Sequence, residues 1–210
     1  RKDNPKNIKD WDDLIRDDVS VITPNPKTSG GARWNYLAAL AYALEENNGD
    51  EEKSRDFMRK LYSNVEVLDS GARSSTTTFA ENGLGDVLVS WENEAYTTID
   101  KLGSDKFEVV YPSISILAEP AVSLVDKVNE KKGTKNVAEE YINYLYSDEG
   151  QKVAAENYYR PSNKKILEEY RNTFKDIKLV SIDDYFGGWK KVSDKYFSDG
   201  GMFDEIYSLG

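Results

Sequence analysis

The sequence predicts an α/β fold in which a mostly parallel sheet is flanked by helices. Short β-branched segments alternate with longer apolar segments of helical character through the first half of the 210-residue chain. Each of the first three β-branched segments is followed by a loop that leads into a helix. Parallel strands need crossover connections, which are usually helices, so this alternation indicates a helix-covered parallel sheet.

The first half of the chain begins with a short helix at residues 9–16, where Trp11, Leu14 and Ile15 recur at helical spacing. The later elements are predicted from β-branched runs, apolar periodicity and turn residues. Strands are expected at 19–23, 65–68, 86–90 and 107–111, and helices at about 34–46, 51–64 and 76–82, with one more helix after Ala95. A long extended stretch at 114–125 follows, interrupted by Pro120.

The second half changes character after the charged connector at 127–133. Helices are expected at 135–146, 149–158 and 164–173, then a short strand at 178–182 and a last helix toward Tyr196. Strands and helices therefore no longer alternate, and this part of the chain is predicted to be mainly helical.

Composition excludes several classes of function. The chain has no Cys and no His, which excludes thiol and imidazole nucleophiles, Cys/His zinc sites and disulfides, so no cofactor is expected. The formal net charge of −10 has the wrong sign for a protein that tracks nucleic-acid phosphates. No stretch of about 18 apolar residues is present, so the sequence predicts no membrane span.

Three strand ends carry the candidate binding residues, because ligands of open parallel sheets lie outside the carboxyl ends of the strands. After the first strand, Ser29 offers a hydroxyl, and Gly30 and Gly31 offer backbone amides at a helix start. After the second, Ala72 offers an amide, and after the third, Trp91 offers its indole N–H. Neutral donors at three loops predict a site for an oxyanion.

The donors favour sulfate over phosphate. Hydrogen phosphate needs an acceptor for its proton, whereas a carboxylate at the same place would repel fully ionised sulfate. Thiosulfate, molybdate and tungstate remain alternatives, since such dianions differ mainly in size.

Other interpretations remain open at this stage. A Ser-Gly-Gly loop before a helix can simply be a turn with an N-cap, and Trp91 can be a packing residue. Arg33 and Arg73 are candidates for a supporting role behind the ligand-contacting residues, or for surface ion pairs. A carboxylate-dependent extracellular hydrolase is the alternative from another class, and a purely structural module is a third. The hydrolase would draw on Glu81, Asp86, Glu92 and Glu94.

The segment from Val21 to Ala39, with its Thr-Ser-Gly-Gly-Ala-Arg-Trp run, strongly resembles bacterial periplasmic sulfate-binding proteins of ABC transporters. The resemblance extends over essentially the whole chain. The further blocks are Asn64-Val-Glu-Val-Leu-Asp-Ser-Gly-Ala-Arg73, Gly85-Asp-Val-Leu-Val-Ser-Trp-Glu-Asn-Glu-Ala95, Ile116-Leu-Ala-Glu-Pro120, Tyr144-Leu-Tyr-Ser-Asp-Glu-Gly-Gln151 and Tyr159-Arg-Pro161.

The resemblance implies a type II periplasmic-binding fold whose two lobes close on sulfate for delivery to a membrane permease, without catalysis. The family's serine hydroxyl and two glycine amides match Ser29, Gly30 and Gly31, and its alanine amide and tryptophan indole match Ala72 and Trp91. Arg33 matches an arginine that supports the binding loop from behind.

Members of that family carry roughly another hundred residues before the position of Arg1, so the resemblance implies a truncated chain. It predicts a complete anion-binding lobe at 1–113, a crossover at 114–126 and helices of an incomplete lobe at 127–210. We then expect exposed apolar helix faces after Lys135, self-association or strand exchange, and a periplasmic or extracellular location, with an anchor if one precedes Arg1.

Overall fold

The computed structural model describes residues 1–207, which form two compact units. The first unit combines residues 1–118 with the C-terminal segment that starts at Ile177, and the second consists of residues 119–176. Each unit is a separate body, and the candidate binding residues all belong to the first.

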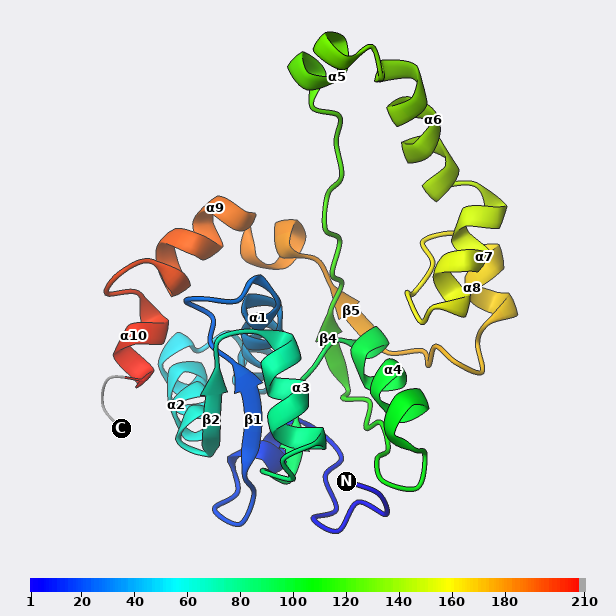
Figure 1. The fold of residues 1–210 in the computed structure, drawn as a ribbon. Helices are drawn as coiled ribbons and strands as arrows, with labels where there is room; N and C mark the ends of the chain where they lie inside the picture. The colour runs from blue at the N-terminus through cyan, green and yellow to red at the C-terminus, as the bar shows by residue number, and fades with distance from the viewer. Residues whose placement is uncertain (208–210) are drawn as a thin grey trace. The chain divides into compact units, whose positions relative to one another are not determined.

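A three-stranded parallel sheet forms the centre of the first unit (Figure 1). Its strands are β1 (Val21–Pro24), β2 (Val65–Asp69) and β3 (Val87–Leu88). The strand order is β2-β1-β3, and β1 pairs in parallel with both neighbours. The predicted α/β fold with parallel strands flanked by helices is confirmed. Because β1 is central, the loop that follows it lies between the loops that follow β2 and β3.

Helices begin directly after the strands of this sheet. Each strand exit thereby points a helix amino terminus toward the same edge. The helices of this part are α1 (Gly30–Glu46), α2 (Glu51–Ser63), α3 (Ala72–Ala80) and α4 (Glu92–Leu102), preceded by the short 3-10 helix η1 (Trp11–Ile15). Side chains cap α1 and α2, since Ser29 accepts a hydrogen bond from the Ala32 amide and Asp50 accepts from the amides of Glu52 and Lys53.

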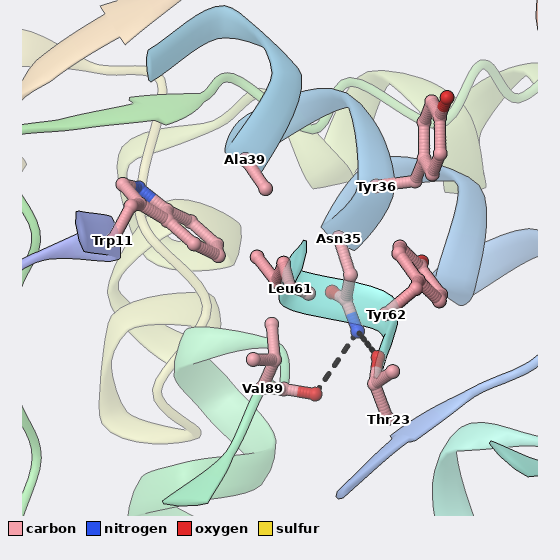
Figure 2. Close-up of a pocket in the computed structure, with 8 residues that line it drawn as sticks. All are labelled: Trp11, Thr23, Asn35, Tyr36, Ala39, Leu61, Tyr62 and Val89. Atoms are coloured by element: carbon pink, nitrogen blue, oxygen red, sulfur yellow. Dashed lines mark hydrogen bonds between the residues drawn. The ribbon is translucent and has the colours of Figure 1, made fainter. Parts of the chain in front are cut away.

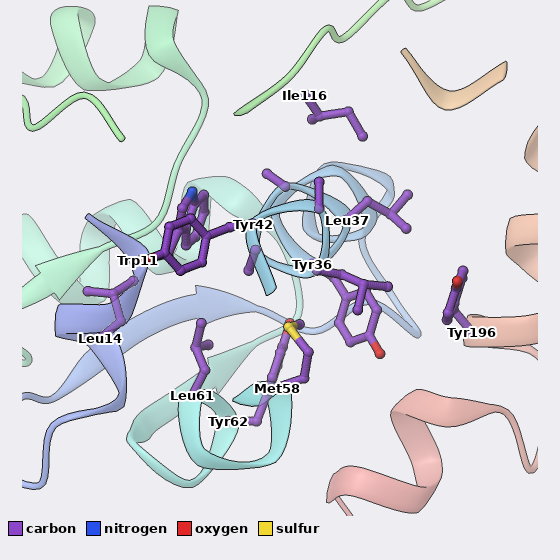
Figure 3. Close-up of a cluster of buried hydrophobic side chains, with 14 of the residues drawn as sticks. Trp11, Leu14, Tyr36, Leu37, Tyr42, Met58, Leu61, Tyr62, Ile116 and Tyr196 are labelled. Carbon is purple, nitrogen blue, oxygen red and sulfur yellow. The ribbon is translucent and has the colours of Figure 1, made fainter. Parts of the chain in front are cut away.

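The core of the first unit is built around α1 (Figure 3). This helix is apolar on nearly all sides, as expected of a helix that is covered all round rather than on one face. Tyr36 is 1% exposed and lies at the centre of an aromatic cluster. Its ring packs edge-on against Phe197 at 5.2 Å and Phe203 at 6.1 Å, and lies 5.8 Å from Tyr62.

The C-terminal segment completes this unit. Strand β5 (Lys178–Val180) pairs in parallel with β4 (Ile114–Ile116) as a second, two-stranded sheet. The chain continues through the π-helical turn η2 (Ile182–Phe186), α9 (Trp189–Val192), the π-helical turn η3 (Ser193–Phe197) and α10 (Met202–Tyr207). Aromatic residues of η3 and α10 pack onto α1 and α2, so the end of the described chain belongs to the same core as its beginning.

The second unit is helical and has a small core. Ala155, Ile166 and Phe174 are its buried apolar residues. Its helices are α5 (Asp126–Lys132), α6 (Lys135–Leu145), α7 (Asp148–Glu156) and α8 (Lys164–Glu169). Large apolar or aromatic side chains on α6 and just after it are exposed, with Val137 at 73% and Tyr146 at 66%. This agrees with the expectation of exposed apolar helix faces after Lys135.

Two predicted elements were wrong. Residues 107–111 form no strand, because Phe107 is buried against Phe79 while the backbone around it finds no neighbouring strand to pair with. Residues 126–132 form the helix α5 where the sequence predicted only a charged connector at 127–133, with Asp126 in the first turn and Gly133 ending the helix in the left-handed conformation.

The division of the chain into lobes stays a prediction. The compact units place residues from Ile177 onward with the first 118 residues, whereas the sequence assigned 127–210 to the other lobe. Among the described residues, none of the helices has the length and apolar character required to span a bilayer.

Candidate functional site

The loop between β1 and α1 carries Ser29, Gly30 and Gly31 at the start of a 17-residue helix. The Ser29 hydroxyl oxygen accepts from the Ala32 amide at 3.3 Å, and this bond leaves the hydroxyl proton free to be donated to a ligand. Gly30 and Gly31 are the first two helical residues, so their amides have no partner within the helix. A Cβ at Gly30 would meet open space.

The indole of Trp91 lies directly against Gly31. A Cβ built on Gly31 would come within 2.5 Å of the Trp91 Nε1 atom, a separation that real Cβ atoms do not tolerate. Trp91 itself is the N-cap residue of α4, at the exit of the third strand. The absence of a side chain at Gly31 therefore allows an indole N–H from one loop to lie beside the backbone amides of another.

The second loop brings Ala72 to the start of α3, and hydrogen bonds join this loop to the first. The Thr28 hydroxyl donates to the Ser70 carbonyl at 2.9 Å, and the Asn25 amide donates to the Asp69 carbonyl at 2.7 Å. The sequence predicted this helix only from Thr76, but it starts at Ala72. The Ala72 amide is thus at a helix amino terminus.

Asn35 connects the first and third strands behind the site. Its amide nitrogen donates to the Val89 carbonyl at 3.0 Å and lies 3.4 Å from the Thr23 hydroxyl (Figure 2). These groups border a small, mostly apolar cavity whose other walls include Trp11 and Leu61. None of the predicted anion-binding residues lines that cavity, so it lies in the packing beneath the loops and is separate from the candidate site.

The two arginines differ in their surroundings. Arg33 donates through Nε to the Pro26 carbonyl at 3.0 Å, and its guanidinium lies 5.2 Å from the centre of the Phe197 ring. It therefore holds the first loop from behind. Arg73 is the second residue of α3 and is exposed, and its side chain makes no hydrogen bond or ion pair with the described residues.

The electrostatics of the helix starts fit an anion. A helix amino terminus carries a partial positive charge, which acidic residues in the first turn normally offset. The first turns of α2 and α7 contain such residues, whereas those of α1 and α3 contain none. The first turn of α4 does contain Glu92 and Glu94, so that helix contributes its preceding indole rather than an unopposed terminus.

The carboxylates of the hydrolase alternative do not all lie together, since Asp86 and the pair Glu92 and Glu94 lie at opposite ends of β3. Asp86 precedes β3, at the end of that strand opposite Trp91, and accepts hydrogen bonds from the Ser20 amide and hydroxyl. Glu92 interacts with Tyr111, whose pKa is raised by burial and by hydrogen bonds to Tyr96 and Glu92. In the described part of the chain, no three acidic residues are grouped so that they could hold a metal ion.

Comparison with known proteins assigns the family. Residues 1–160 match the bacterial extracellular solute-binding proteins. The chain belongs to this family. Among the solute-binding proteins most similar to it is the sulfate-binding protein of Escherichia coli, which is 64% identical over 206 residues, covering 98% of this chain and 63% of the relative. The chain thus spans less than two thirds of the length of that relative.

Two further solute-binding proteins bear on the ligand. The thiosulfate-binding protein of Pseudomonas aeruginosa is 52% identical over 208 residues, covering 99% of this chain and 62% of the relative. The solved structure of the sulfate-binding protein SubI from Mycobacterium tuberculosis aligns with a TM-score of 0.74 at 30% identity, covering 94% of this chain and 67% of that one. The resemblance to sulfate-binding proteins is confirmed by these relationships.

Sequence reasoning missed the residues that hold the loops together. The polar Asn35, next to the long apolar run of α1, is a usable signal, since a partly buried amide requires partners. Nothing in the sequence marks the Thr28 hydroxyl as the link to the Ser70 carbonyl. Lys27 carried no signal, because its partners lie 170 or more residues later in the chain.

Proposed function

We propose that this solute-binding protein captures sulfate through neutral hydrogen-bond donors. The donors are the Ser29 hydroxyl, the amides of Gly30, Gly31 and Ala72, and the Trp91 indole. One observation carries the proposal: the Trp91 Nε1 atom lies so close to Gly31 that a side chain there would collide with it. Donors from two different strand ends therefore lie next to each other, beside the starts of α1 and α3, whose first turns contain no acidic residue.

Selectivity for sulfate over phosphate follows from the kind of groups present. Amides, an indole and a hydroxyl donate to an ionised oxygen, and sulfate keeps its double charge at neutral pH. Hydrogen phosphate brings a proton that needs an acceptor, and the proposed donors do not provide a carboxylate for it.

Calorimetric titration of Trp91→Phe tests the proposal. Removing one charge-assisted donor is expected to weaken sulfate binding by about 1–3 kcal/mol. Trp189→Phe is the matched control, since this exposed indole packs on Trp34 and is not part of the proposed site. Phosphate binding as tight as sulfate binding, or an unchanged Trp91→Phe variant, would contradict the proposed donor set.

Thiosulfate is the second candidate ligand. The Pseudomonas aeruginosa relative named for thiosulfate binding is 52% identical to this chain, and thiosulfate presents oxygens of the same kind to donors. Competition titrations with thiosulfate, molybdate and tungstate against sulfate would rank these anions.

The wider role follows from the family. We infer that the whole protein acts outside the cytoplasm, delivers its anion to the membrane permease of an ABC transporter and catalyses no reaction. Membrane anchoring and self-association through the exposed apolar residues of α6 stay predictions, and light scattering would measure the latter.

A further inference from the structure

Lys27 lies two residues before Ser29, in a loop that is folded around Asn25. The Asn25 carbonyl accepts from the amides of Thr28 at 3.1 Å and Ser29 at 2.9 Å, and its side-chain oxygen accepts from the Lys27 amide at 2.8 Å. The backbone at Lys27 is thereby coupled to the backbone that presents Ser29. A displacement of Lys27 would move the start of α1.

The ammonium group of Lys27 is directed at the C-terminal segment rather than at the candidate site. Four oxygens surround its Nζ atom within hydrogen-bonding distance. They are the carbonyls of Phe197 and Ser198 and a carboxylate oxygen of Asp199, each at 3.2 Å, and the Oδ2 atom of Asp204 at 2.9 Å. Because an ammonium has three donors, they are shared among these acceptors and none is left for a ligand.

Asp204 is itself held in place. Its Oδ2 atom also accepts from the Gly200 amide at 2.8 Å. The hydrogen bond from Lys27, followed by that amide, lowers the pKa of Asp204. The hydrogen bond to Asp204 correspondingly raises the pKa of Lys27, so both groups are charged at neutral pH.

The segment that receives Lys27 is anchored in the core. Phe197 is 4% exposed and Phe203 is 2% exposed, and both pack edge-on against Tyr36 of α1. Arg33, on the other side of Ser29, reaches the same segment through the Phe197 ring while it donates to the Pro26 carbonyl. Both cations that flank Ser29, Gly30 and Gly31 therefore contact one buried part of the C-terminal segment.

We propose that Lys27 is a positioning residue that fixes the anion-binding loop to residues 197–204, and that its pairing with Asp199 and Asp204 keeps its charge out of the anion site. The effect on affinity rests on the proposed sulfate function, whereas the effect on loop order does not. The C-terminal segment thus becomes part of the binding apparatus without touching the ligand.

Two readouts on the full chain test this inference. The first is hydrogen exchange at the amides of Thr28, Ser29 and Ala32 without sulfate, since these amides are hydrogen-bonded only while the loop keeps its form. We expect Lys27→Met to speed this exchange several-fold and Lys27→Arg to restore most of the protection. The second is calorimetric sulfate affinity, which Lys27→Met should lower roughly tenfold, the lower end of the effect known for groups that orient metal ligands from behind.

Lys195→Met is the matched control. Lys195 belongs to the same C-terminal segment and pairs at 2.7 Å with Glu51 of α2, away from the binding loop. Neither readout should change in this variant. Equal effects of Lys195→Met and Lys27→Met would overturn the inference, because the loss would then reflect a general loosening of the segment.

The outcomes separate this inference from the proposed function. Unchanged exchange at 28–32 in Lys27→Met overturns the positioning role, whatever happens to affinity. Failure of the unaltered chain to bind sulfate refutes sulfate binding by this chain, while the exchange comparison still decides the role of Lys27.

Discussion

Gly31 is the position where the site tolerates no side chain, and its neighbour Gly30 provides a natural comparison. Both are glycines at the start of α1, and neither has the positive φ that would require glycine. A Cβ at Gly31 meets the Trp91 indole at 2.5 Å, whereas one at Gly30 meets nothing within 4 Å. Packing against Trp91 therefore requires glycine at position 31 but not at position 30.

Gly31→Ala is expected to destabilise the chain by about 1–3 kcal/mol, because the added methyl group must displace Trp91. Gly30→Ala should stay within about 0.5 kcal/mol of the unaltered chain or stabilise it slightly, since alanine restricts the unfolded chain. Urea unfolding of both variants measures the difference. Equal stabilities would show that Trp91 moves aside at no cost, and the close packing of indole and backbone would lose its significance.

At the scale of elements, the strand exits and the helices behind them could be predicted from the sequence. The strands predicted at 19–23, 65–68 and 86–90 correspond to β1, β2 and β3, and a helix follows each of them as expected. The start of α3 was predicted four residues late, at Thr76 instead of Ala72. Local pattern suffices there because the residues that form each turn are neighbours in the chain. The structure then adds how these loops are tied to one another.

The prediction of structure failed where the deciding contacts join residues that are far apart in the sequence. Residues 107–111 have strand-like composition, but a strand needs a pairing partner, and composition cannot supply one. The bond from Lys27 to Asp204 spans 177 positions and leaves no periodic trace in either segment. Lys27 and Asp204 look like ordinary surface charges in the sequence, which is the usual interpretation of such residues.

Substitution of Asn35 tests whether the hydrogen bond between α1 and the end of the third strand supports the binding site. Asn35→Leu removes the donor to the Val89 carbonyl, and we expect a loss of about 1–3 kcal/mol in unfolding free energy together with weaker sulfate binding. Asn64→Leu is the matched variant, because Asn64 donates to the carbonyls of Leu14 and Arg16 away from the site. It should lose similar stability but keep its sulfate affinity. If both variants have the same sulfate affinity, Asn35 does not support the site.

At the scale of the whole molecule, the acidic residues govern the stability of the folded chain at low pH. Several aspartates have a pKa below the ordinary value of 3.8 because they accept hydrogen bonds in the folded chain. For Asp18 the main cause is the hydrogen bond from Arg16, for Asp50 the Lys53 amide, and for Asp204 the Lys27 ammonium. A pKa lowered on folding stabilises the folded state wherever the carboxylate is charged.

These aspartates should therefore contribute a nearly constant amount to the free energy of unfolding above pH 3.8, their pKa in the unfolded chain. That contribution should fall as the pH drops through their lowered pKa values in the folded chain. Protonation of the acidic residues also leaves 28 basic residues unopposed, which adds repulsion. Urea midpoints measured from neutral to acid pH give the profile. Asp204→Asn should flatten the fall, and an unchanged profile in that variant would remove Asp204 from this account.

The placement of the tryptophans has a practical consequence. The chain has four, and Trp34 lies 6.3 Å from Trp91 and 4.7 Å from Trp189, ring centre to ring centre. The fourth, Trp11, is buried and donates its indole N–H to the Ile114 carbonyl in the core. Three of the four indoles therefore lie together, and the proposed anion donor is one of them. The chain carries its own fluorescent reporter, and an anion bonded to Trp91 would change its emission without any attached dye.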